Sequence, residues 1–205
     1  VWYKARLQND VQGKWGKAPH LIEEVYNLED ALVVAQWMNV FLRKSDVLKI
    51  ACLAQIVNVI APILTTRDAM LKQSIFYPFL LFSRLASGKA LDVGVKSPMY
   101  HTAKFGDMPL LDVSSSFNEE TSTNGIFIGN RSQTERVQVD LQWQDRTPRS
   151  FNTAYQVAGT DPKAANTYEK PNQVVAVQVA APAFSDRSAV LVVPPLSFTA
   201  IEARL

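Results

Sequence analysis

The stretch Lys49-Ile-Ala-Cys-Leu-Ala-Gln-Ile-Val-Asn-Val-Ile-Ala-Pro62 decides how the rest of the chain is interpreted. It is a long apolar run in which two amides, Gln55 and Asn58, stand among aliphatic residues. A buried amide without a partner costs about 1–3 kcal/mol, so Gln55 requires a partner from the backbone, another side chain or a ligand. If Gln55 lies at the C-terminal end of a buried strand, a ligand becomes a serious option. Pro62 then ends the run, because it disfavours helix at Ala61.

The start of this run and the residues before it predict an α/β arrangement. The segment of residues 47–53 is short and apolar and follows a predicted helix. These features are typical of a strand that is buried on both faces of a parallel sheet. The helix starts after Asn27, an N-cap that forms a variant of the capping box with Asp30. Its apolar positions recur with helical spacing at Leu28, Leu32, Ala35, Met38 or Asn39, and Leu42.

The residues after the run predict a second helix and then a change of period. Residues 74–87 are rich in Phe, Leu and Tyr and predict a helix, with Pro78 tolerated in its first turn and Gly88 closing it as the C′ residue. From about residue 91 onward the apolar period becomes two. The predicted strands are 110–117, 126–130, 136–143, 174–179, 189–193 and 197–201. Short alternating strands with recurrent turn signals predict an antiparallel sandwich, so an α/β piece (residues 1–90) precedes an all-β domain (residues 91–205).

Composition excludes several classes of function. The chain has 205 residues, a net charge of +2 and 47% hydrophobic residues, which is ordinary for a globular protein. Its basic residues form no stripe, so no nucleic-acid partner is expected. No apolar segment reaches the roughly 18 residues that a membrane helix needs, so no membrane partner is expected either. The single cysteine, Cys52, excludes an intramolecular disulfide and is expected to be a small buried core residue.

Three stretches, taken together, resemble the C-terminal half of α-L-arabinofuranosidases of glycoside hydrolase family 51. They are Val1-Trp2-Tyr3, then Leu21-Ile-Glu-Glu-Val-Tyr-Asn-Leu-Glu-Asp-Ala-Leu32, then Lys49 through Thr65 together with Gln73-Ser-Ile-Phe-Tyr-Pro78. The resemblance is close over residues 1 to about 100, whereas the β region matches only in placement and general pattern. It implies the C-terminal part of a (β/α)8 TIM barrel, residues 1–90, followed by a β-sandwich of jelly-roll type, residues 91–205.

The resemblance also implies a function. Family members hydrolyse terminal α-L-arabinofuranosyl linkages in arabinoxylan and arabinan with retention, which requires two carboxyl groups about 5–5.5 Å apart. In the family, the nucleophile is the Glu of an Asp-Glu-Trp-Asn motif directly before Val-Trp-Tyr, and the acid/base lies further upstream. Both catalytic carboxylates are therefore expected upstream of Val1, and the absence of an initiator Met suggests a fragment of a longer protein. The fragment alone is expected to be inactive.

Three residues are implied to contact substrate. Gln55 matches the glutamine at the end of the eighth barrel strand that hydrogen-bonds the arabinose unit, which agrees with its unusual place in the apolar run. Trp2 matches a tryptophan beside the nucleophile loop, where an indole can pack on a sugar ring. Asn58 is the weakest candidate, because it can simply cap the chain as it turns. A structural amide remains the alternative for Gln55.

Other polar residues have simpler interpretations. Glu29 and Asp30 belong to a helix first turn, where the helix dipole favours acidic residues, and Glu23 or Glu24 can brace a loop. His20 and His101 stand far apart without a second ligand, so no metal and no cofactor is expected.

The expected partners are an arabinose-containing oligosaccharide or polysaccharide, the missing N-terminal part of the barrel, and further copies of the full-length protein as a homo-oligomer. A cytoplasmic location is expected from the resemblance and the unpaired thiol. The competing hypothesis is a non-catalytic β-sandwich module for carbohydrate binding or subunit packing. The sequence does not favour this hypothesis, because the predicted strands of the β domain carry no regular row of exposed aromatic residues.

Overall fold

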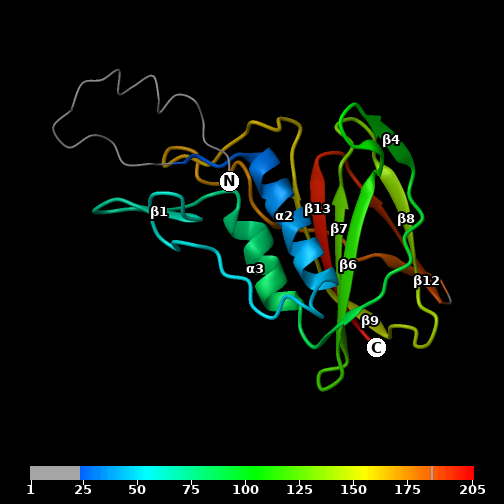
Figure 1. Ribbon diagram of the computed structural model, residues 1–205. Helices are drawn as coiled ribbons and strands as arrows, with labels where there is room; N and C mark the ends of the chain where they lie inside the picture. The colour runs from blue at the N-terminus through cyan, green and yellow to red at the C-terminus, as the bar shows by residue number, and fades with distance from the viewer. Residues whose placement is uncertain (1–23, 186) are drawn as a thin grey trace.

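Two antiparallel sheets and two helices dominate a computed structural model that describes residues 24–185 and 187–205 (Figure 1). The larger sheet has six strands in the order β10, β9, β13, β7, β6, β3, and all of its pairings are antiparallel. The helices α2 and α3 cover one face of this sheet, and a smaller sheet of β11, β12 and β8 lies on the other face (Figure 1). Two short strand pairs, β1 with β2 and β4 with β5, lie outside the two sheets.

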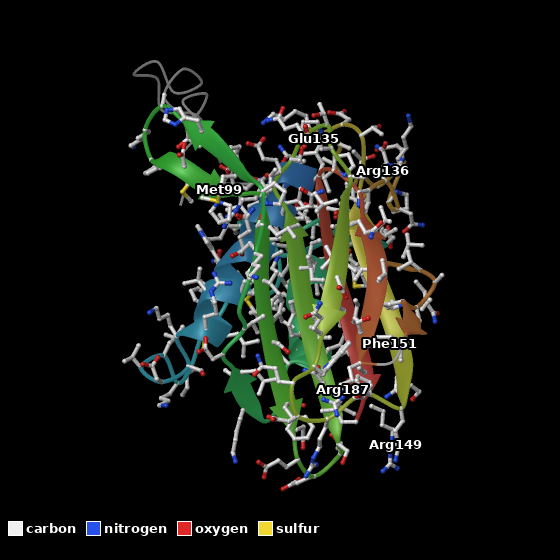
Figure 2. The ribbon with its side chains drawn as sticks, turned by 90° about the vertical axis from the view of Figure 1, so that its right-hand side faces the viewer. Met99, Glu135, Arg136, Arg149, Phe151 and Arg187 are labelled. Atoms are coloured by element: carbon white, nitrogen blue, oxygen red, sulfur yellow. The ribbon has the colours of Figure 1, made fainter. Side chains whose placement is uncertain are left out.

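The helices are α2 (Leu28–Arg43) and α3 (Phe76–Leu85). The strands of the larger sheet are β3 (Lys89–Leu91), β6 (Leu111–Asn118), β7 (Thr123–Asn130), β9 (Ser150–Ala158), β10 (Val177–Gln178) and β13 (Ser197–Arg204). The smaller sheet contains β8 (Val137–Gln142), β11 (Ala183–Ser185) and β12 (Ser188–Val193). The outlying pairs are β1 (Ile63–Thr65) with β2 (Met70–Lys72), and β4 (Met99–Thr102) with β5 (Gly106–Pro109). In Figure 2, the pair β4–β5, marked by Met99, projects past the end of the two sheets.

Helix α2 begins where its sequence predicts. The Asn27 side chain accepts a hydrogen bond from the backbone N of Asp30 at 3.1 Å, and Asp30 Oδ2 accepts one from the backbone N of Asn27 at 2.9 Å. This reciprocal pair satisfies two of the backbone donors that a helix start leaves open. Leu28, Ala31 and Ala35 are almost fully buried, so the apolar stripe faces the sheet.

Helix α3 begins two residues later than predicted and carries Pro78 in its first turn, as expected. Gly88 does not close it, and that prediction is wrong. The helix ends at Leu85, and Ala86 already has an extended backbone with ψ 100°. Gly88 instead has φ +78° beside β6, where an added Cβ would lie 2.1 Å from the carbonyl oxygen of Phe117.

Stacked aromatic rings pack between the helices and the face of the larger sheet that they cover. The centroids of Phe82 on α3 and Phe127 on β7 lie 4.0 Å apart, and those of Phe82 and Phe198 on β13 lie 5.6 Å apart. Phe127 and Phe198 are 0% and 1% exposed. Burying one such side chain contributes about 1.5–3 kcal/mol, so these contacts are a principal attachment of the helices to the sheet.

The opposite face packs against the smaller sheet, because side chains alternate along each strand. Ile126 and Ile128 flank Phe127 in sequence and point into this second core. The smaller sheet contributes Val193 together with Val137 and Val139. Figure 2 views the molecule from the side of this smaller sheet, with Arg136 and Arg187 near the strand ends. The prediction of packed antiparallel strands is therefore confirmed.

The strand between residues 47 and 53 does not form, and this prediction is wrong. Residues 47–54 have no strand assignment, and Val47 and Ile50 are 77% and 79% exposed. A parallel strand satisfies its backbone groups only through neighbours, and no strand of the described residues lies beside this segment. For the same reason Cys52 is exposed rather than buried in a core.

Candidate functional site

The candidate site lies on the segment between α2 and β1, residues 44–62, which carries Gln55 and Asn58. Gln55 is exposed, and its side chain has no hydrogen-bond partner among the described residues. The expectation of a buried amide at this position is therefore wrong for this chain, because the strand that would bury it is absent. Trp2, the other predicted substrate contact, lies outside the described residues.

Asn58 closes a turn. Its Oδ1 accepts a hydrogen bond from the backbone N of Thr65 at 2.7 Å, and its Nδ2 donates to Thr65 Oγ1 at 3.0 Å. Its own backbone N donates to the carbonyl of Ile63 at 2.8 Å. These contacts match the simpler interpretation, in which Asn58 caps the chain as it turns.

The backbone of this segment is strained. Gln55, Asn58 and Val59 have φ values of 53°, 62° and 61°, in the left-handed region that disfavours side chains with a Cβ. The conformation is costliest for Val59, because its Cβ is branched. Such positions cost about 1–3 kcal/mol each and persist only when surrounding contacts hold them, which is frequent at functional sites.

Gln73 is the contact that holds the end of this segment. It is 1% exposed, its Nε2 donates to the carbonyl of Ala61 at 2.7 Å, and its Oε1 accepts from the backbone N of Tyr26 at 3.0 Å. The backbone N of Gln73 also donates to the carbonyl of Pro62 at 2.8 Å. The apolar run predicted a buried, hydrogen-bonded glutamine at Gln55, whereas the structure has one at Gln73, eighteen positions later and outside the run.

Tyr26 and its neighbour Glu24 donate further hydrogen bonds to this segment. Its Oη donates to the carbonyl of Ile60 at 2.9 Å, and the neighbouring backbone N of Glu24 donates to the carbonyl of Val59 at 3.0 Å. Burial, followed by the carboxylates of Glu24 and Asp30, raises the pKa of the Tyr26 phenol. The phenol consequently remains a donor to Ile60 well into the alkaline range. Gln73, Tyr26 and the backbone of Glu24 join residues 24–27 to residues 59–62, and we name these contacts the loop clamp.

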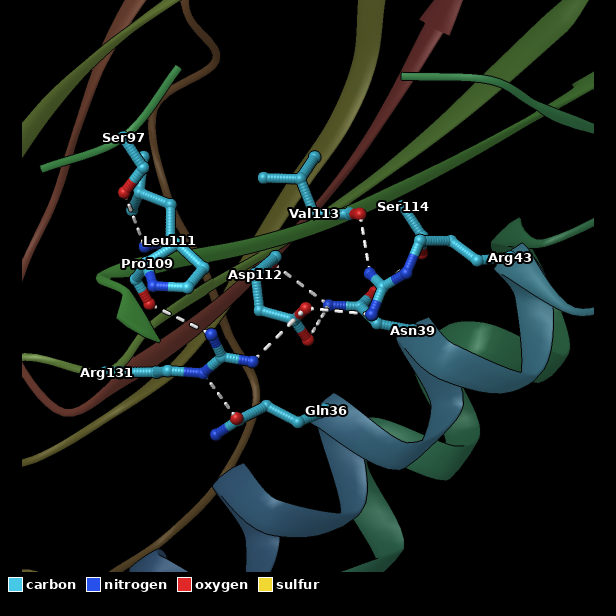
Figure 3. A network of polar contacts seen from close by, with 10 residues as sticks. All are labelled: Gln36, Asn39, Arg43, Ser97, Pro109, Leu111, Asp112, Val113, Ser114 and Arg131. Carbon is cyan, nitrogen blue, oxygen red and sulfur yellow. Dashed lines mark hydrogen bonds and ion pairs between the residues drawn. The ribbon is translucent and has the colours of Figure 1, made fainter. Parts of the chain in front are cut away.

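A buried polar network lies elsewhere and is structural. Asp112 on β6 is 6% exposed, and its carboxylate contacts Arg43 Nη2 at 2.9 Å, Arg131 Nη2 at 3.4 Å and Asn39 Nδ2 at 3.0 Å (Figure 3). Gln36 accepts from Arg131 Nε at 2.7 Å. Every charge in this network is used to join α2 to the sheet, so it offers no free group for chemistry.

Glu29, Asp30 and His101 have local partners. Glu29 pairs with Lys163 on the surface, and this contact raises the pKa of the Lys163 amine. Asp30 caps α2, as predicted. His101 Nδ1 lies 2.8 Å from Asp107 Oδ1 across the pair β4–β5, whereas His20 and Glu23 lie outside the described residues. Residues 24–185 and 187–205 contain no cluster of three or more residues able to hold a metal.

An open hollow of about 550 Å³ lies between α2, the pair β4–β5 and the loop that contains Lys163. Its lining includes Tyr100, Gln36 and Arg131, but the two latter side chains already bond one another. In the smaller sheet, strands β8 and β12 contain no aromatic residue and β11 contains one, Phe184, so no row of aromatic residues runs across it. These features do not favour a separate carbohydrate-binding module. No helix in the described ranges is long and apolar enough to cross a membrane.

Sequence reasoning missed Gln73 and Tyr26. Both lie in stretches that carry the family resemblance, but neither stands in an apolar run that would mark it as a buried polar residue. Their partners are 12 to 47 positions away in the chain. Only the packing of the two helices brings these segments together.

Comparison with known proteins gives the family. The family model described as the alpha-L-arabinofuranosidase C-terminal domain matches residues 1–197. An intracellular exo-alpha-(1->5)-L-arabinofuranosidase of Streptomyces lividans is 34% identical, with 98% of this chain and 30% of that protein covered. An exo-alpha-(1->6)-L-arabinofuranosidase of Bifidobacterium longum is also 34% identical, with 100% of this chain and 40% of that protein covered. The chain thus spans well under half of the length of these relatives.

Solved structures agree with this assignment. A family 51 alpha-L-arabinofuranosidase from Bifidobacterium longum superposes with a TM-score of 0.86 at 29% identity, covering 93% of this chain and 38% of that chain. An alpha-L-arabinofuranosidase from Thermotoga maritima, at 23% identity and a TM-score of 0.80 over 93% of this chain and 41% of that chain, shares the fold. The resemblance to family 51 is confirmed, and the chain belongs to the alpha-L-arabinofuranosidase C-terminal domain family.

Proposed function

We propose that this chain is the C-terminal portion of a retaining, exo-acting α-L-arabinofuranosidase. The full-length protein would remove terminal non-reducing α-L-arabinofuranosyl residues from arabinoxylan and arabinan oligosaccharides. Its nucleophile and its acid/base, both glutamates, would lie upstream of Val1. The observation that carries this proposal is the family match over residues 1–197, together with relatives that are named as exo-arabinofuranosidases.

Within this function, the chain would supply one wall of the sugar pocket. Gln55 would hydrogen-bond the arabinose unit and Trp2 would pack against it, with Asn58 as a weaker candidate. The strained backbone at Gln55 supports a functional segment, because strain of this kind concentrates at ligand sites.

The exposed apolar segment supports the barrel. We propose that residues 47–54 form the last strand of a (β/α)8 barrel when the upstream part is present, and that the β domain is of jelly-roll type. Ile50 and Val47 would then leave solvent, since a strand in a closed barrel is covered on both faces. Hydrogen–deuterium exchange of the full-length protein should show slow amides over residues 47–54, whereas the 205-residue chain should exchange them fast. Equally fast exchange in both proteins would count against the strand.

Turnover by the full-length protein tests the function itself. It should release arabinose from an aryl α-L-arabinofuranoside with retained configuration, as followed by NMR of the first-formed sugar. Gln55→Ala should weaken transition-state binding by about 1–3 kcal/mol, a loss in kcat/KM of roughly 5- to 150-fold, because a ligand hydrogen bond disappears. Gln138→Ala is the matched control, since Gln138 is an exposed glutamine on the outer sheet. An unchanged kcat/KM in Gln55→Ala would remove Gln55 from the site.

The same relatives support a proposal for the location and the substrate of the full-length protein. Two of them, from Streptomyces lividans and Bacillus subtilis, are named intracellular, which supports a cytoplasmic location. The substrate would be an arabinose-containing glycan, and no cofactor would be required. We also propose a homo-oligomer for the full-length protein, to be checked by light scattering at micromolar concentration.

A further inference from the structure

The loop clamp binds a run of consecutive backbone carbonyls. The backbone N of Glu24, the Tyr26 hydroxyl and the Gln73 amide donate hydrogen bonds to three consecutive carbonyls. These are the carbonyls of Val59, Ile60 and Ala61. The carbonyl of Pro62 is bound as well, by the backbone N of Gln73. The four adjacent carbonyls from Val59 to Pro62 are therefore fixed, and the first of them belongs to the second strained residue.

The clamp is buried, whereas the residue it would orient is exposed. Gln73 is 1% exposed and Ala61 is 0% exposed, so the tie is shielded from water. Gln55 stands only six positions before Ala61 on the same segment, and it also has a positive φ. A segment that is strained in the middle and fixed at its end can hold an exposed side chain in one orientation.

The three parts of the clamp come from segments that are distant in the chain. Residues 24–27 lead into α2, residues 59–62 follow the strained positions, and Gln73 precedes α3. Ser74 Oγ adds a hydrogen bond to the carbonyl of Asn27 at 2.6 Å, which joins the starts of the two helices. Because both helices are packed on the sheet through Phe82 and Leu28, the clamp fixes the segment to the rigid part of the molecule.

We propose that Gln73, assisted by Tyr26, is a positioning residue that sets the orientation of Gln55 toward the arabinose unit. This inference rests on the proposed function, and it adds two residues that do not themselves contact the sugar. Gln73 would act through the backbone carbonyl of Ala61, and Tyr26 through that of Ile60. A displacement of about 1 Å in a group that orients substrate can lower the rate by roughly 100-fold, so the effect is measurable.

The experiment uses the full-length protein with an aryl α-L-arabinofuranoside. Gln73→Met keeps the length of the side chain and removes both of its hydrogen bonds. We expect a fall in kcat/KM of about tenfold, since a misplaced Gln55 loses part of its contact with the transition state. Asn124→Leu is the matched control, because Asn124 is a 2% exposed amide that donates to Ser115 and Ser116 and accepts from Trp143 in the other core. It should lower the urea midpoint while leaving kcat/KM unchanged.

A double-mutant cycle separates positioning from general damage. If Gln73 acts through Gln55, then Gln55→Ala with Gln73→Met should lose no more activity than Gln55→Ala alone. Two losses that multiply, or wild-type kcat/KM in Gln73→Met, would overturn the inference. If Gln73→Met fails to fold, Tyr26→Phe replaces it in the same cycle. We expect kcat/KM to fall about threefold in Tyr26→Phe, and the double variant with Gln55→Ala to lose no more activity than Gln55→Ala alone. A wild-type protein that releases no arabinose would instead overturn the proposed function, so the two failures are distinguishable.

Discussion

Asp112 illustrates how a buried charge can hold a helix to a sheet without taking part in chemistry. Its carboxylate lies between Arg43 and Arg131, and Asn39 donates to it as well. Removing one partner from such a group leaves uncompensated charge in a buried place, which costs about 3–5 kcal/mol. Asp112→Ala should therefore lower the free energy of unfolding by about 3 kcal/mol in urea denaturation, because Arg43 is partly exposed and can recover some solvation.

The matched control for Asp112 is Asp140→Ala. Asp140 is an exposed carboxylate on β8 whose partner is Gln142 on the same strand. Its removal should change stability by less than about 0.5 kcal/mol, as is usual for surface substitutions. Equal losses in the two variants would mean that the network around Asp112 contributes nothing specific.

Tyr26 gives a prediction for alkaline pH. Its folded pKa is raised above the ordinary value of 10.0, chiefly by burial, so the folded state keeps the phenol proton longer than the unfolded state. The contribution of Tyr26 to stability is therefore complete below about pH 10 and is lost as the pH rises through its folded pKa. Between about pH 9 and 11, the free energy of unfolding of Tyr26→Phe should fall less steeply than that of the wild type.

A second tyrosine makes this comparison clean. Burial also raises the pKa of Tyr77, but Tyr77 is present in both proteins and its contribution cancels in the difference. The measurement is the urea midpoint at several alkaline pH values. Parallel curves for the two proteins would show that the Tyr26 phenol is not held as described.

Single residues differ in how far the sequence reveals their roles. The capping pair of Asn27 and Asp30 was predictable because both partners lie within one turn of the chain. Asn58 was also predictable as a turn residue, since Thr65 is only seven positions away. Gln73 was not, because its partners are set by the packing of separate helices. Gln55 was expected to be buried, but the neighbours needed for that are absent from the described residues.

At the scale of elements, the junction between α3 and β3 depends on Gly88. Its φ of +78° disfavours any other residue, and an added Cβ would meet the backbone oxygen of Phe117 at 2.1 Å. Gly88→Ala combines a strained backbone with a clash that no side chain can relieve, so it should cost about 3 kcal/mol. Chemical denaturation of the variant measures this loss.

Gly106 separates the two causes. Its φ is +70°, nearly the same as that of Gly88, but nothing lies within 4 Å of an added Cβ. Gly106→Ala should therefore cost only about 1 kcal/mol, the conformational part alone. If both variants lost the same free energy of unfolding, the close approach of β6 would not explain why position 88 requires glycine.

The elements also differ in how well the sequence predicts them. Helix α2 and strands β6 and β13 follow from local pattern, because their apolar spacing matches the faces they bury. Strand β9, which is nine residues long, was missed because its two buried apolar residues, Ala154 and Val157, lie three positions apart and face opposite sides of the sheet, so no single apolar face marks it. Residues 47–53 have the strongest strand pattern and form none. Strand formation depends on neighbouring strands, and a local pattern cannot supply them.

At the scale of the whole molecule, the helices and the sheet share one core. The division into residues 1–90 and 91–205 stays a prediction. A chain that begins at Leu91 would lack α2 and α3 and would expose the sheet face that contains Phe127 and Phe198. Because each of these rings contributes about 1.5–3 kcal/mol when buried, the truncated chain should lose cooperative unfolding and bind a hydrophobic dye.

The comparison protein for this test is a chain that begins at Glu24 and retains both helices. It should unfold cooperatively and bind less dye than the shorter chain, as followed by near-UV circular dichroism and dye fluorescence. Native-like spectra from the chain that begins at Leu91 would show that the β domain is stable without its helices.

Strand β13 lies in the middle of the larger sheet, between β9 and β7. It is also the strand nearest the C-terminus. A ribosome makes residues in order, so the nascent chain must expose residue 204 beyond the exit tunnel before this sheet can close. Until then, the two flanking strands have no partner between them and the helices have no complete surface to pack on. Translation speed and chaperone binding should therefore govern the yield of this chain more strongly than its final stability suggests.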